Sequence, residues 1–337
     1  MQYVTLGNTG LHVSRLCLGS SNFGKATDKP FSLPIDEVRP IIRRALELGL
    51  NYFDTAETYL MGTSETMLGT LFKELVPDRE DIVISTKFGP GPYPVGINRS
   101  GVSRKHIMDG IDQSLRRLQV DYVDVYSMHR LDGITPFEET LETLDDIVRA
   151  GKARYIGTSG CYAWQLERML SLQERHGWTK FVVMQNQYAL TYREEEREMI
   201  PLLIDRDIAM TPWGALSAGM LAGTIGRDGT RTTHRARTDL LRGIGGHAPT
   251  TEQDFNIQDR VREVADRNGM AMGEVALAWS LSKPYVTAPI IGASSVAQLE
   301  SSVATLGKAL SPEDIARLEE PYRPIMPQTL TPPHRRR

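Results

Sequence analysis

The chain has 337 residues and a nearly balanced charge, with 39 Lys and Arg against 42 Asp and Glu and a formal net charge of -3. This balance creates no electrostatic field that would attract nucleic acid or an anionic membrane surface, so we expect neither as a partner. Hydrophobic residues make up 40% of the chain and charged residues 24%. This composition is typical of a globular protein and excludes a disordered or fibrous one.

Cysteine and histidine usage limits the chemistry and the compartment. Two cysteines, Cys17 and Cys161, are too few for a disulfide framework, and the histidines lack metal-ligand spacing, so we expect no metal. Sparing use of cysteine is typical of a reducing compartment, and we expect a cytoplasmic protein. No apolar run approaches the roughly 20 residues that span a bilayer, and no signal segment opens the chain, so we expect it to be soluble.

The order of predicted elements begins with a hairpin. Two short strand-like runs at 2–6 and 11–14 flank a Gly-Asn-Thr-Gly turn. Short apolar runs then alternate with stretches of helical period. Strands are expected at about 16–18, 52–53, 82–84, 122–128, 153–158, 181–184, 208–211 and 288–291. Helices are expected at about 38–49, 64–75, 103–118, 135–151, 163–176, 194–205, from 256 onward and at 296–306, with one more after Ser311 and Pro312.

Eight strand-helix units predict a closed (β/α)8 TIM barrel, an α/β fold. A doubly wound sheet normally opens with a Gly-x-Gly-x-x-Gly turn, which this sequence lacks. We expect one domain over residues 1–330 and a flexible tail at 331–337. The Thr-Pro-Phe-Glu sequence at 135–138 predicts a capping box on the fourth helix. The Gly- and Arg-rich stretch 214–250 is too long for an ordinary connection and is a candidate functional loop.

Polar residues at the ends of three consecutive strands are candidates for chemistry. Asp54 ends the second strand, Tyr59 comes five residues later, Lys87 ends the third strand and His129 ends the fourth. Because active sites of such barrels lie at the carboxyl ends of the strands, we expect these four side chains to share one pocket.

These residue types suit proton transfer to a carbonyl oxygen. A tyrosine phenol, with a pKa of about 10, is too weak an acid unless a nearby cation stabilises its phenolate. Lys87 is placed to supply the cation, Asp54 to be its counter-ion and His129 to orient the substrate oxygen. This is the acid-base chemistry of ketone reduction with hydride from a nicotinamide. The alternative is a structural ion pair of Asp54 with Lys87, with Tyr59 and His129 only lining a loop.

Several motifs carry a family resemblance. The Asn-Tyr-Phe-Asp-Thr-Ala-Glu-Thr-Tyr sequence at 51–59, followed by Ser64-Glu65 and Leu68-Gly69, resembles the aldo-keto reductase signature. Further motifs follow in that family's order at 85–87, 128–130, 151–157, 184–186 and 211–213. The resemblance covers about residues 3–306, and the sequence at 192–201 is similar to the bacterial and fungal aryl-alcohol-dehydrogenase-like branch.

The resemblance implies an NADP(H)-dependent enzyme that reduces an aldehyde or ketone to an alcohol. Tyr59 would be the proton donor, Asp54 and Lys87 would tune it, and His129 would orient the substrate. Residues implied to line the cofactor site are Ser20 and Ser21 near the reacting centre, Ser159, Gly160 and Gln185 at the carboxamide, Trp213 on the ring, Leu216, Ala218 and Gly219 at the pyrophosphate, and Gly292, Ser294, Gln298 and Ser302 at the adenosine end.

Some positions depart from the family pattern. Gly160 stands where many relatives have Asn, which removes one amide partner of the nicotinamide carboxamide. Ser301 and Ser302 replace a Glu-Asn pair that usually reads adenine, and Ser294 replaces a basic residue that some relatives use for the 2′-phosphate. Arginines of the long loop are substitute phosphate ligands, since guanidinium matches phosphate bidentately. They are Arg227, Arg231, Arg235 and Arg237.

Two other functions stay open. The first is a regulatory protein that binds the cofactor, because potassium-channel beta subunits resemble the same family, although without a counterpart of His129. The second is a reductase of an enone or of a sugar-linked ketone. The expected partner is a small carbonyl or alcohol substrate, and Tyr93, Leu131 and Trp213 suggest an apolar one, either aromatic or polycyclic. The oligomeric state and the physiological direction stay open.

Overall fold

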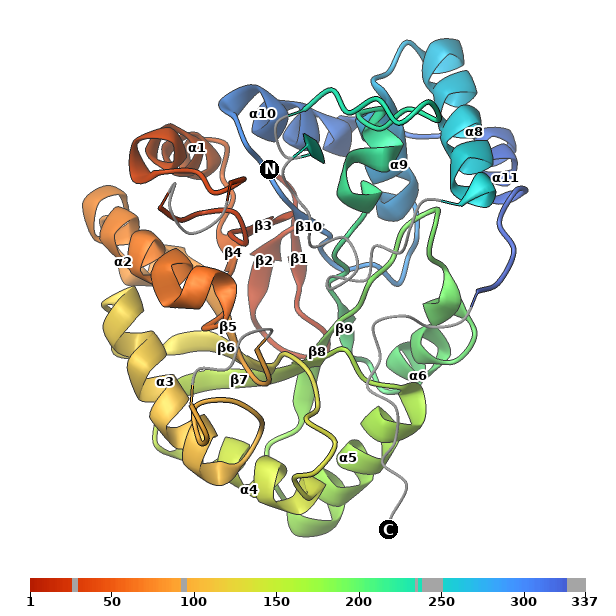
Figure 1. Ribbon diagram of the computed structural model, residues 1–337. Coiled ribbons are helices and arrows are strands. Elements are labelled where there is room, and N and C mark those ends of the chain that lie inside the picture. Colours follow the sequence, from red (N-terminus) through yellow and green to blue (C-terminus); the bar gives the residue numbers. More distant parts are fainter. Residues whose placement is uncertain (26–29, 92–95, 234–235, 238–250, 326–337) are drawn as a thin grey trace.

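The computed structural model describes residues 1–25, 30–91, 96–233, 236–237 and 251–325. Figure 1 shows helices arranged in a ring around a central group of strands. The strands of the barrel are β3 (Cys17–Gly19), β4 (Tyr52–Asp54), β5 (Val83–Phe88), β6 (Val123–Met128), β7 (Ala153–Ser159), β8 (Phe181–Gln185), β9 (Ala209–Met210) and β10 (Ile290–Ile291). They form one parallel sheet in the order β10-β3-β4-β5-β6-β7-β8-β9.

The sheet curls until its two edges meet. Met210 of β9 forms a parallel bridge with Val286, and the Thr287 N–H donates to the Met210 carbonyl at 2.8 Å. The Ile290 N–H then donates to the Pro212 carbonyl at 2.8 Å. These bonds join the last strand to β9, so the predicted (β/α)8 barrel is confirmed.

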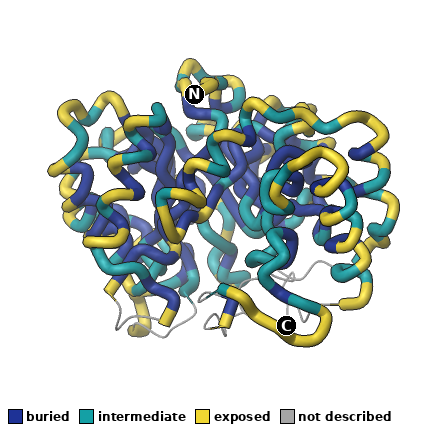
Figure 2. Tube along the Cα trace, turned by 90° about the horizontal axis from the view of Figure 1, so that it is seen from above, coloured by how far each residue is buried: buried dark blue, intermediate teal, exposed yellow. Residues whose placement is uncertain are grey.

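The predicted N-terminal hairpin closes one end of the barrel. Strand β1 (Tyr3–Thr5) pairs antiparallel with β2 (His12–Ser14). Leu6 and Val13 of this hairpin are buried with Cys17 in a cluster inside the barrel. Figure 2 shows the N-terminus at one end of the molecule, with buried segments between the outer helices. The hairpin therefore covers the amino-terminal ends of the strands and leaves their carboxyl ends for the site.

Helices cover the outside of the barrel. They are α1 (Ile35–Glu47), α2 (Thr63–Leu75), α3 (Arg104–Leu118), α4 (Phe137–Arg149), α5 (Ala163–His176), α6 (Met199–Asp205), α8 (Glu252–Asn268), α9 (Met272–Leu281), α10 (Val296–Ala304) and α11 (Pro312–Glu319). Short 3-10 turns are η1 (Tyr59–Gly62), η2 (Arg79–Asp81), η3 (Glu194–Glu196), η4 (Ser217–Ala222) and η6 (Thr305–Gly307). In α3, the predicted face of Ile107, Ile111, Leu115 and Leu118, spaced by three and four, faces the core: Leu115 is half-buried and the other three are buried.

The start of α4 differs from the predicted capping box. The helix begins at Phe137 after Pro136, whose position has no side-chain cap. Thr135 therefore lies one residue before the N-cap, too early to cap the helix, and its hydroxyl donates to Asp132 Oδ2 at 2.7 Å. The Ser311 cap is confirmed, because its hydroxyl accepts from the Asp314 N–H at 3.1 Å.

The sixth and seventh helical units also differ from the prediction. The sixth begins as the turn η3 and becomes α-helical only at Met199. The seventh contains two helices, and α8 begins at Glu252 rather than near residue 256 because Thr251 and Asp254 form a capping box there. Helix α9 was not predicted. Its residues are mostly apolar around the whole helix, so no polar face marks its period.

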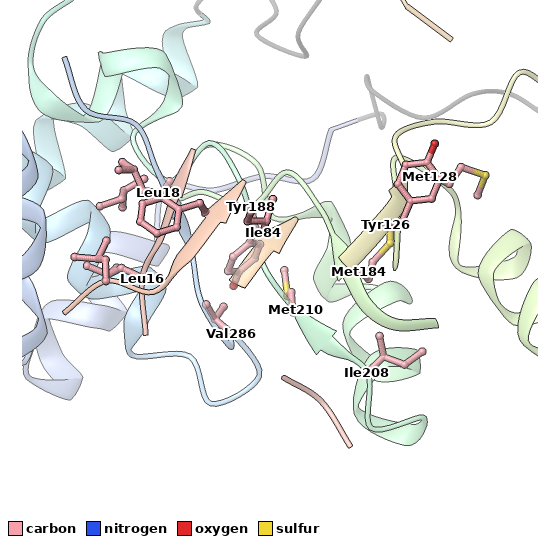
Figure 3. Close-up of a cluster of buried hydrophobic side chains, with 14 of the residues drawn as sticks. Leu16, Leu18, Ile84, Tyr126, Met128, Met184, Tyr188, Ile208, Met210 and Val286 are labelled. Atoms are coloured by element: carbon pink, nitrogen blue, oxygen red, sulfur yellow. The ribbon is translucent and has the colours of Figure 1, made fainter. Parts of the chain in front are cut away.

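Alternation along the strands divides the core into two layers. Side chains such as Leu18, Ile84 and Met184 face the helices, and Figure 3 shows part of this outer cluster. The neighbouring positions, such as Val83 and Val183, face the barrel interior. The outer layer thus packs the helices against the sheet, while the interior layer continues to the carboxyl ends of the strands, where the candidate site lies.

The interior layer becomes polar toward the carboxyl ends of the strands. Two residues beyond Tyr52 the same face carries Asp54, and four residues beyond Val83 it carries Lys87. Because strand side chains alternate with a period of two, these polar groups point into the barrel above an apolar layer. The period of the strands therefore positions the site.

Candidate active site

Lys87 and Asp54 form a buried ion pair. Lys87 is fully buried and Asp54 is 2% exposed. Lys87 Nζ donates to Asp54 Oδ2 at 2.6 Å and to the Thr55 carbonyl at 2.7 Å. Burial lowers the pKa of Lys87, but the charges of Asp54 and Tyr59 outweigh it and raise this pKa above its usual value. The ammonium group therefore stays charged inside the barrel, as predicted.

Tyr59 contacts this pair from the connection between β4 and α2. Lys87 Nζ donates to the Tyr59 hydroxyl oxygen at 3.2 Å and lies 4.7 Å from the centre of its ring. The next two residues, Leu60 and Met61, have left-handed φ angles of 49° and 56°. Such angles cost roughly 1 to 2 kcal/mol for residues other than glycine, so the surrounding structure fixes the turn that presents Tyr59.

The pKa of Tyr59 differs from the simplest expectation. Burial raises the pKa of the phenol above its usual value, the charge of Lys87 lowers it, and Asp54 raises it again. The net direction is upward, whereas the sequence led us to expect a phenol acidified by Lys87. Lys87 therefore limits the rise that burial causes.

His129 follows β6 directly and faces Tyr59. Its N–H donates to the Phe88 carbonyl at 2.7 Å, which ties it to β5. The rings of His129 and Tyr59 meet edge to face with 5.7 Å between their centres, and the Thr58 hydroxyl lies 3.3 Å from His129 Nδ1. Burial lowers the pKa of His129 well below its usual value, and the charges of Lys87 and Arg130 lower it further. The imidazole is therefore neutral at pH 7.

The structure brings the four predicted catalytic residues together. Asp54, Lys87 and Tyr59 are joined by hydrogen bonds, and the His129 ring packs against Tyr59. Gln185 of β8 joins them, since its Nε2 donates to Asp54 Oδ1 at 3.0 Å. A buried chain of proton donors and acceptors thus ends at a phenol beside a neutral imidazole, an arrangement suited to acid-base chemistry.

A sequence model described as "Aldo/keto reductase family" matches residues 15–323. The chain belongs to the aldo-keto reductase family. It is 40% identical over 340 residues to the versiconal hemiacetal acetate reductase of Aspergillus parasiticus, covering 96% of this chain and 98% of that protein. It is 36% identical over 348 residues to the aldo-keto reductase AMT2 of Alternaria alternata, covering 97% of this chain and 93% of that protein.

A third relative comes from Schizosaccharomyces pombe, and its name assigns it provisionally to the aryl-alcohol dehydrogenases. It is 37% identical over 350 residues, covering 96% of each chain. These matches confirm the family resemblance. Aldo-keto reductases are oxidoreductases that use nicotinamide cofactors, so the chain is an oxidoreductase that acts on small carbonyl substrates.

The residues at the ends of β7 and β8 fit the carboxamide of such a cofactor. Ser159 and Gln185 are paired in register on these strands. Ser159 is 3% exposed, and its hydroxyl makes no hydrogen bond to any residue within the described ranges. The residue is buried, but its hydroxyl oxygen still reaches open space beside the primary amide of Gln185, so the two groups can together pair with a carboxamide. Trp213 is held nearby, because its N–H donates to the Asn186 carbonyl at 2.8 Å.

The segment expected at the pyrophosphate forms a tight turn. Ser217, Ala218 and Gly219 have φ angles of 47°, 54° and 92°. A Cβ at Gly219 would come within 2.4 Å of Thr224 Oγ1, so this position requires glycine. Leu216 precedes the turn and is half-buried.

The residues expected at the adenosine end lie around the start of α10. The Ser294 N–H donates to Gln298 Oε1 at 2.8 Å, and the Ser302 hydroxyl donates to the Gln298 carbonyl at 3.0 Å. Gly292 is exposed. Ser20, by contrast, is engaged inside the barrel, since its hydroxyl donates to the Asp54 carbonyl at 3.0 Å.

The loop arginines have different partners. Arg227 forms ion pairs with Glu252 and with Asp259, the latter at 2.9 Å. Arg231 and Arg237 donate to backbone carbonyls of their own loop. Two predicted residues, Arg235 and Tyr93, lie outside the described residues, and Ser21 is exposed.

Sequence reasoning missed Glu57, which joins three segments around the site. Its Oε1 accepts from the Gly89 N–H at 3.0 Å and lies 2.8 Å from His106 Nε2. Glu57 thereby links the end of β4 to the loop after β5 and to α3. Its position three residues after Asp54 was a signal, but no sequence spacing relates it to His106.

The described part of the chain shows neither a metal-binding cluster nor a membrane-spanning helix. Within it, no three His, Cys, Asp or Glu side chains are grouped so as to hold a metal ion. None of the helices described is both long and apolar enough to span a bilayer.

Proposed function

We propose that this protein reduces an aldehyde or ketone to an alcohol with hydride from NADPH and a proton from Tyr59. One observation carries the proposal. A single buried ammonium, Lys87 Nζ, lies within hydrogen-bonding distance of both Asp54 and Tyr59, at 2.6 Å and 3.2 Å. A structural ion pair has no need of a third contact to a phenol, so this geometry favours an acid-base site.

Each residue has a defined task in the reaction. When bound, the nicotinamide would supply the hydride that reduces the carbonyl carbon. Tyr59 gives its proton to the carbonyl oxygen, and Lys87 stabilises the negative charge that this leaves on the phenol oxygen. Asp54 keeps Lys87 charged, while neutral His129 orients the carbonyl oxygen.

Ser159 and Gln185 would hold the carboxamide of the nicotinamide, and Trp213 would lie against its ring. The bond from Gln185 to Asp54 connects this cofactor side to the proton-donating side. We propose NADPH rather than NADH, with phosphate ligands from the loop after β9. Arg231 and Arg237 support this assignment, since neither has a carboxylate partner among the described residues.

Two further features are proposed with this function. Residues 1–330 would form one catalytic domain, supported by the family match over residues 15–323. A cytoplasmic location is supported by the two cysteines, which are both buried free thiols. The name of the Aspergillus parasiticus relative gives versiconal hemiacetal acetate as its substrate, which supports a small organic carbonyl compound here.

The test combines cofactor binding with turnover. Protein fluorescence is titrated with NADPH and NADH, and a carbonyl panel is then followed at the cofactor absorbance band. The panel includes an enone and a sugar-linked ketone. Tyr59→Phe is expected to bind NADPH within about twofold of the parent and to lose roughly 100-fold or more in turnover, because it removes the proton donor. Tyr155→Phe on β7 is the matched control and should keep its turnover.

The other outcomes separate the alternatives. Tight cofactor binding without turnover of any carbonyl would favour the regulatory protein. Turnover of the enone alone would favour that second class of reductase. Binding of neither nucleotide would contradict the whole proposal.

A further inference from the structure

Arg130 is a half-buried arginine beside the site that has no partner among the described residues. It directly follows His129 at the end of β6. None of its guanidinium donors makes a hydrogen bond or ion pair with a residue in the described ranges. Burial lowers its pKa below the usual value. The contrast is Arg15, also partly buried, which donates to three backbone carbonyls. A guanidinium removed from water normally requires such acceptors.

Two glycines make room for Arg130. A Cβ at Gly160 would lie 3.1 Å from Arg130 Cγ and 3.9 Å from its Cβ, and Gly160 has a φ of 58°. A Cβ at Gly89 would lie 3.3 Å from both the N and the O of Arg130. The stem of Arg130 therefore packs along the backbone after β7. Gly160 is one of the positions at which this chain departs from the family pattern, and Arg130 lines the space beside it.

The nearby carboxylates are already engaged. Asp132 Oδ2 accepts from the Val102 N–H at 3.0 Å and from the Thr135 hydroxyl at 2.7 Å. Glu57 is paired with His106, and Asp54 with Lys87. The site thus has a positive charge beside Tyr59 and His129 for which the described residues provide no counter-charge.

We propose that Arg130 binds an anionic group of the substrate, so that the preferred substrate is a carbonyl compound with a carboxylate or another anionic oxygen a few bonds from its carbonyl. This inference rests on the proposed function. Guanidinium binds carboxylate in a planar, bidentate geometry. Exposed apolar side chains at the same end of the barrel favour an apolar body for the rest of this substrate. They are Met61 at 72%, Ile134 at 79% and Trp164 at 47% exposure.

The experiment compares an acid with its neutral ester. We measure kcat/KM for 3-carboxybenzaldehyde and for its methyl ester in the parent, Arg130→Met and Arg130→Lys. The parent is expected to prefer the acid. In Arg130→Met the acid-to-ester ratio of kcat/KM should fall roughly 10- to 100-fold, mainly through KM of the acid, because a bidentate charged contact is lost. Arg130→Lys should keep part of the preference, since it keeps the charge without the planar fork.

Two controls isolate the contact. Arg116→Met removes the same charge from an exposed position near the carboxyl end of α3, at the opposite end of the barrel, and should leave the ratio unchanged. Loss of Arg130 also alters the electrostatics of Tyr59 and His129, but that effect acts on both compounds and cancels in the ratio.

A binding measurement separates this inference from the proposed function. Calorimetric titration with isophthalate should show binding to the parent and at least tenfold weaker binding to Arg130→Met. If neither aldehyde is reduced, the proposed function fails, and this titration alone decides the anion site. Equal acid-to-ester ratios, isophthalate binding that does not depend on Arg130, or a loss confined to NADPH binding would each overturn the inference.

Discussion

Glu195 carries a buried carboxyl group next to Asn186, the residue that follows Gln185. It is 5% exposed, and its Oε2 accepts from Asn186 Nδ2 at 2.9 Å. Burial raises the pKa of Glu195 to about 8, the bond from Asn186 opposes this rise, and Glu194 adds to it. This residue therefore takes up a proton on folding in the neutral pH range, in which an exposed glutamate is ionised.

Because the folded state raises the pKa of Glu195, the protein should lose stability as the pH rises. Between its ordinary pKa of 4.5 and about 8, the folded chain holds a proton on Glu195 that the unfolded chain has lost. The contribution of protonated Glu195 to the free energy of unfolding is therefore fully present below pH 4.5 and is lost as the pH rises through 8. Glu195→Gln should be about 2 to 4 kcal/mol more stable than the parent at pH 8.5 and nearly equal to it at pH 5, as measured by urea unfolding. The same difference at both pH values would contradict this, and exposed Glu138→Gln serves as the control.

Helix α2 lies unusually close to α3 at Gly69. A Cβ there would come within 2.5 Å of the Arg117 carbonyl oxygen and 2.6 Å of the Leu118 carbonyl carbon. The same helix pair is tied by Glu65, which accepts from Arg117 Nε at 2.6 Å and from the Thr86 hydroxyl at 2.5 Å. Since Thr86 precedes Lys87 on β5, this packing supports the strand that carries Lys87.

Gly69→Ala sets two effects against each other. Alanine favours a helix over glycine by roughly 1 kcal/mol, but the new methyl group meets backbone that cannot move aside easily. We expect the clash to dominate and to destabilise the protein by about 1 to 3 kcal/mol in denaturant unfolding. Thr70→Ala, at the next and exposed position of α2, should change stability by less than about 0.5 kcal/mol. A Gly69→Ala protein as stable as the parent would show that the two helices can separate freely.

At the scale of the whole molecule, Arg15 joins the first strand unit to the last. Its guanidinium donates to the Leu281 carbonyl at 3.1 Å and to the carbonyls of Val286 and Thr287. Val286 and Thr287 belong to the segment whose bonds close the barrel between β9 and β10, and Leu281 ends α9. One side chain near the N-terminus thus satisfies backbone acceptors far along the chain.

Arg15→Met should weaken the closure of the barrel. It removes a charged donor from three partly buried carbonyls, and we expect a loss of about 2 to 4 kcal/mol in the free energy of unfolding. Near-ultraviolet circular dichroism and tryptophan fluorescence should report a single shifted transition, because the barrel closes as one unit. Arg116→Met is again the charge control, and equal losses in the two variants would refute a specific role for Arg15.

The sequence by itself predicted the hairpin, the eight strands of the barrel and the residues that we propose as catalytic. Strand and helix periods are local properties of the chain, so they predicted the barrel directly. Asp54, Lys87 and His129 were found because they stand at the ends of consecutive strands, and consecutive strands of a barrel are neighbours in space.

Only the tertiary structure decided which residues distant in sequence form hydrogen bonds with one another and which become buried. The bond from Gln185 to Asp54 spans 131 positions, and no local pattern encodes it. The helix α4 takes Pro136 rather than Thr135 as its N-cap, so the predicted capping box does not form. The upward shift of the Tyr59 pKa also depends on burial, which arises when distant strands close around the phenol. Periodicity acts between neighbours in sequence, whereas desolvation and hydrogen-bond competition act between neighbours in space.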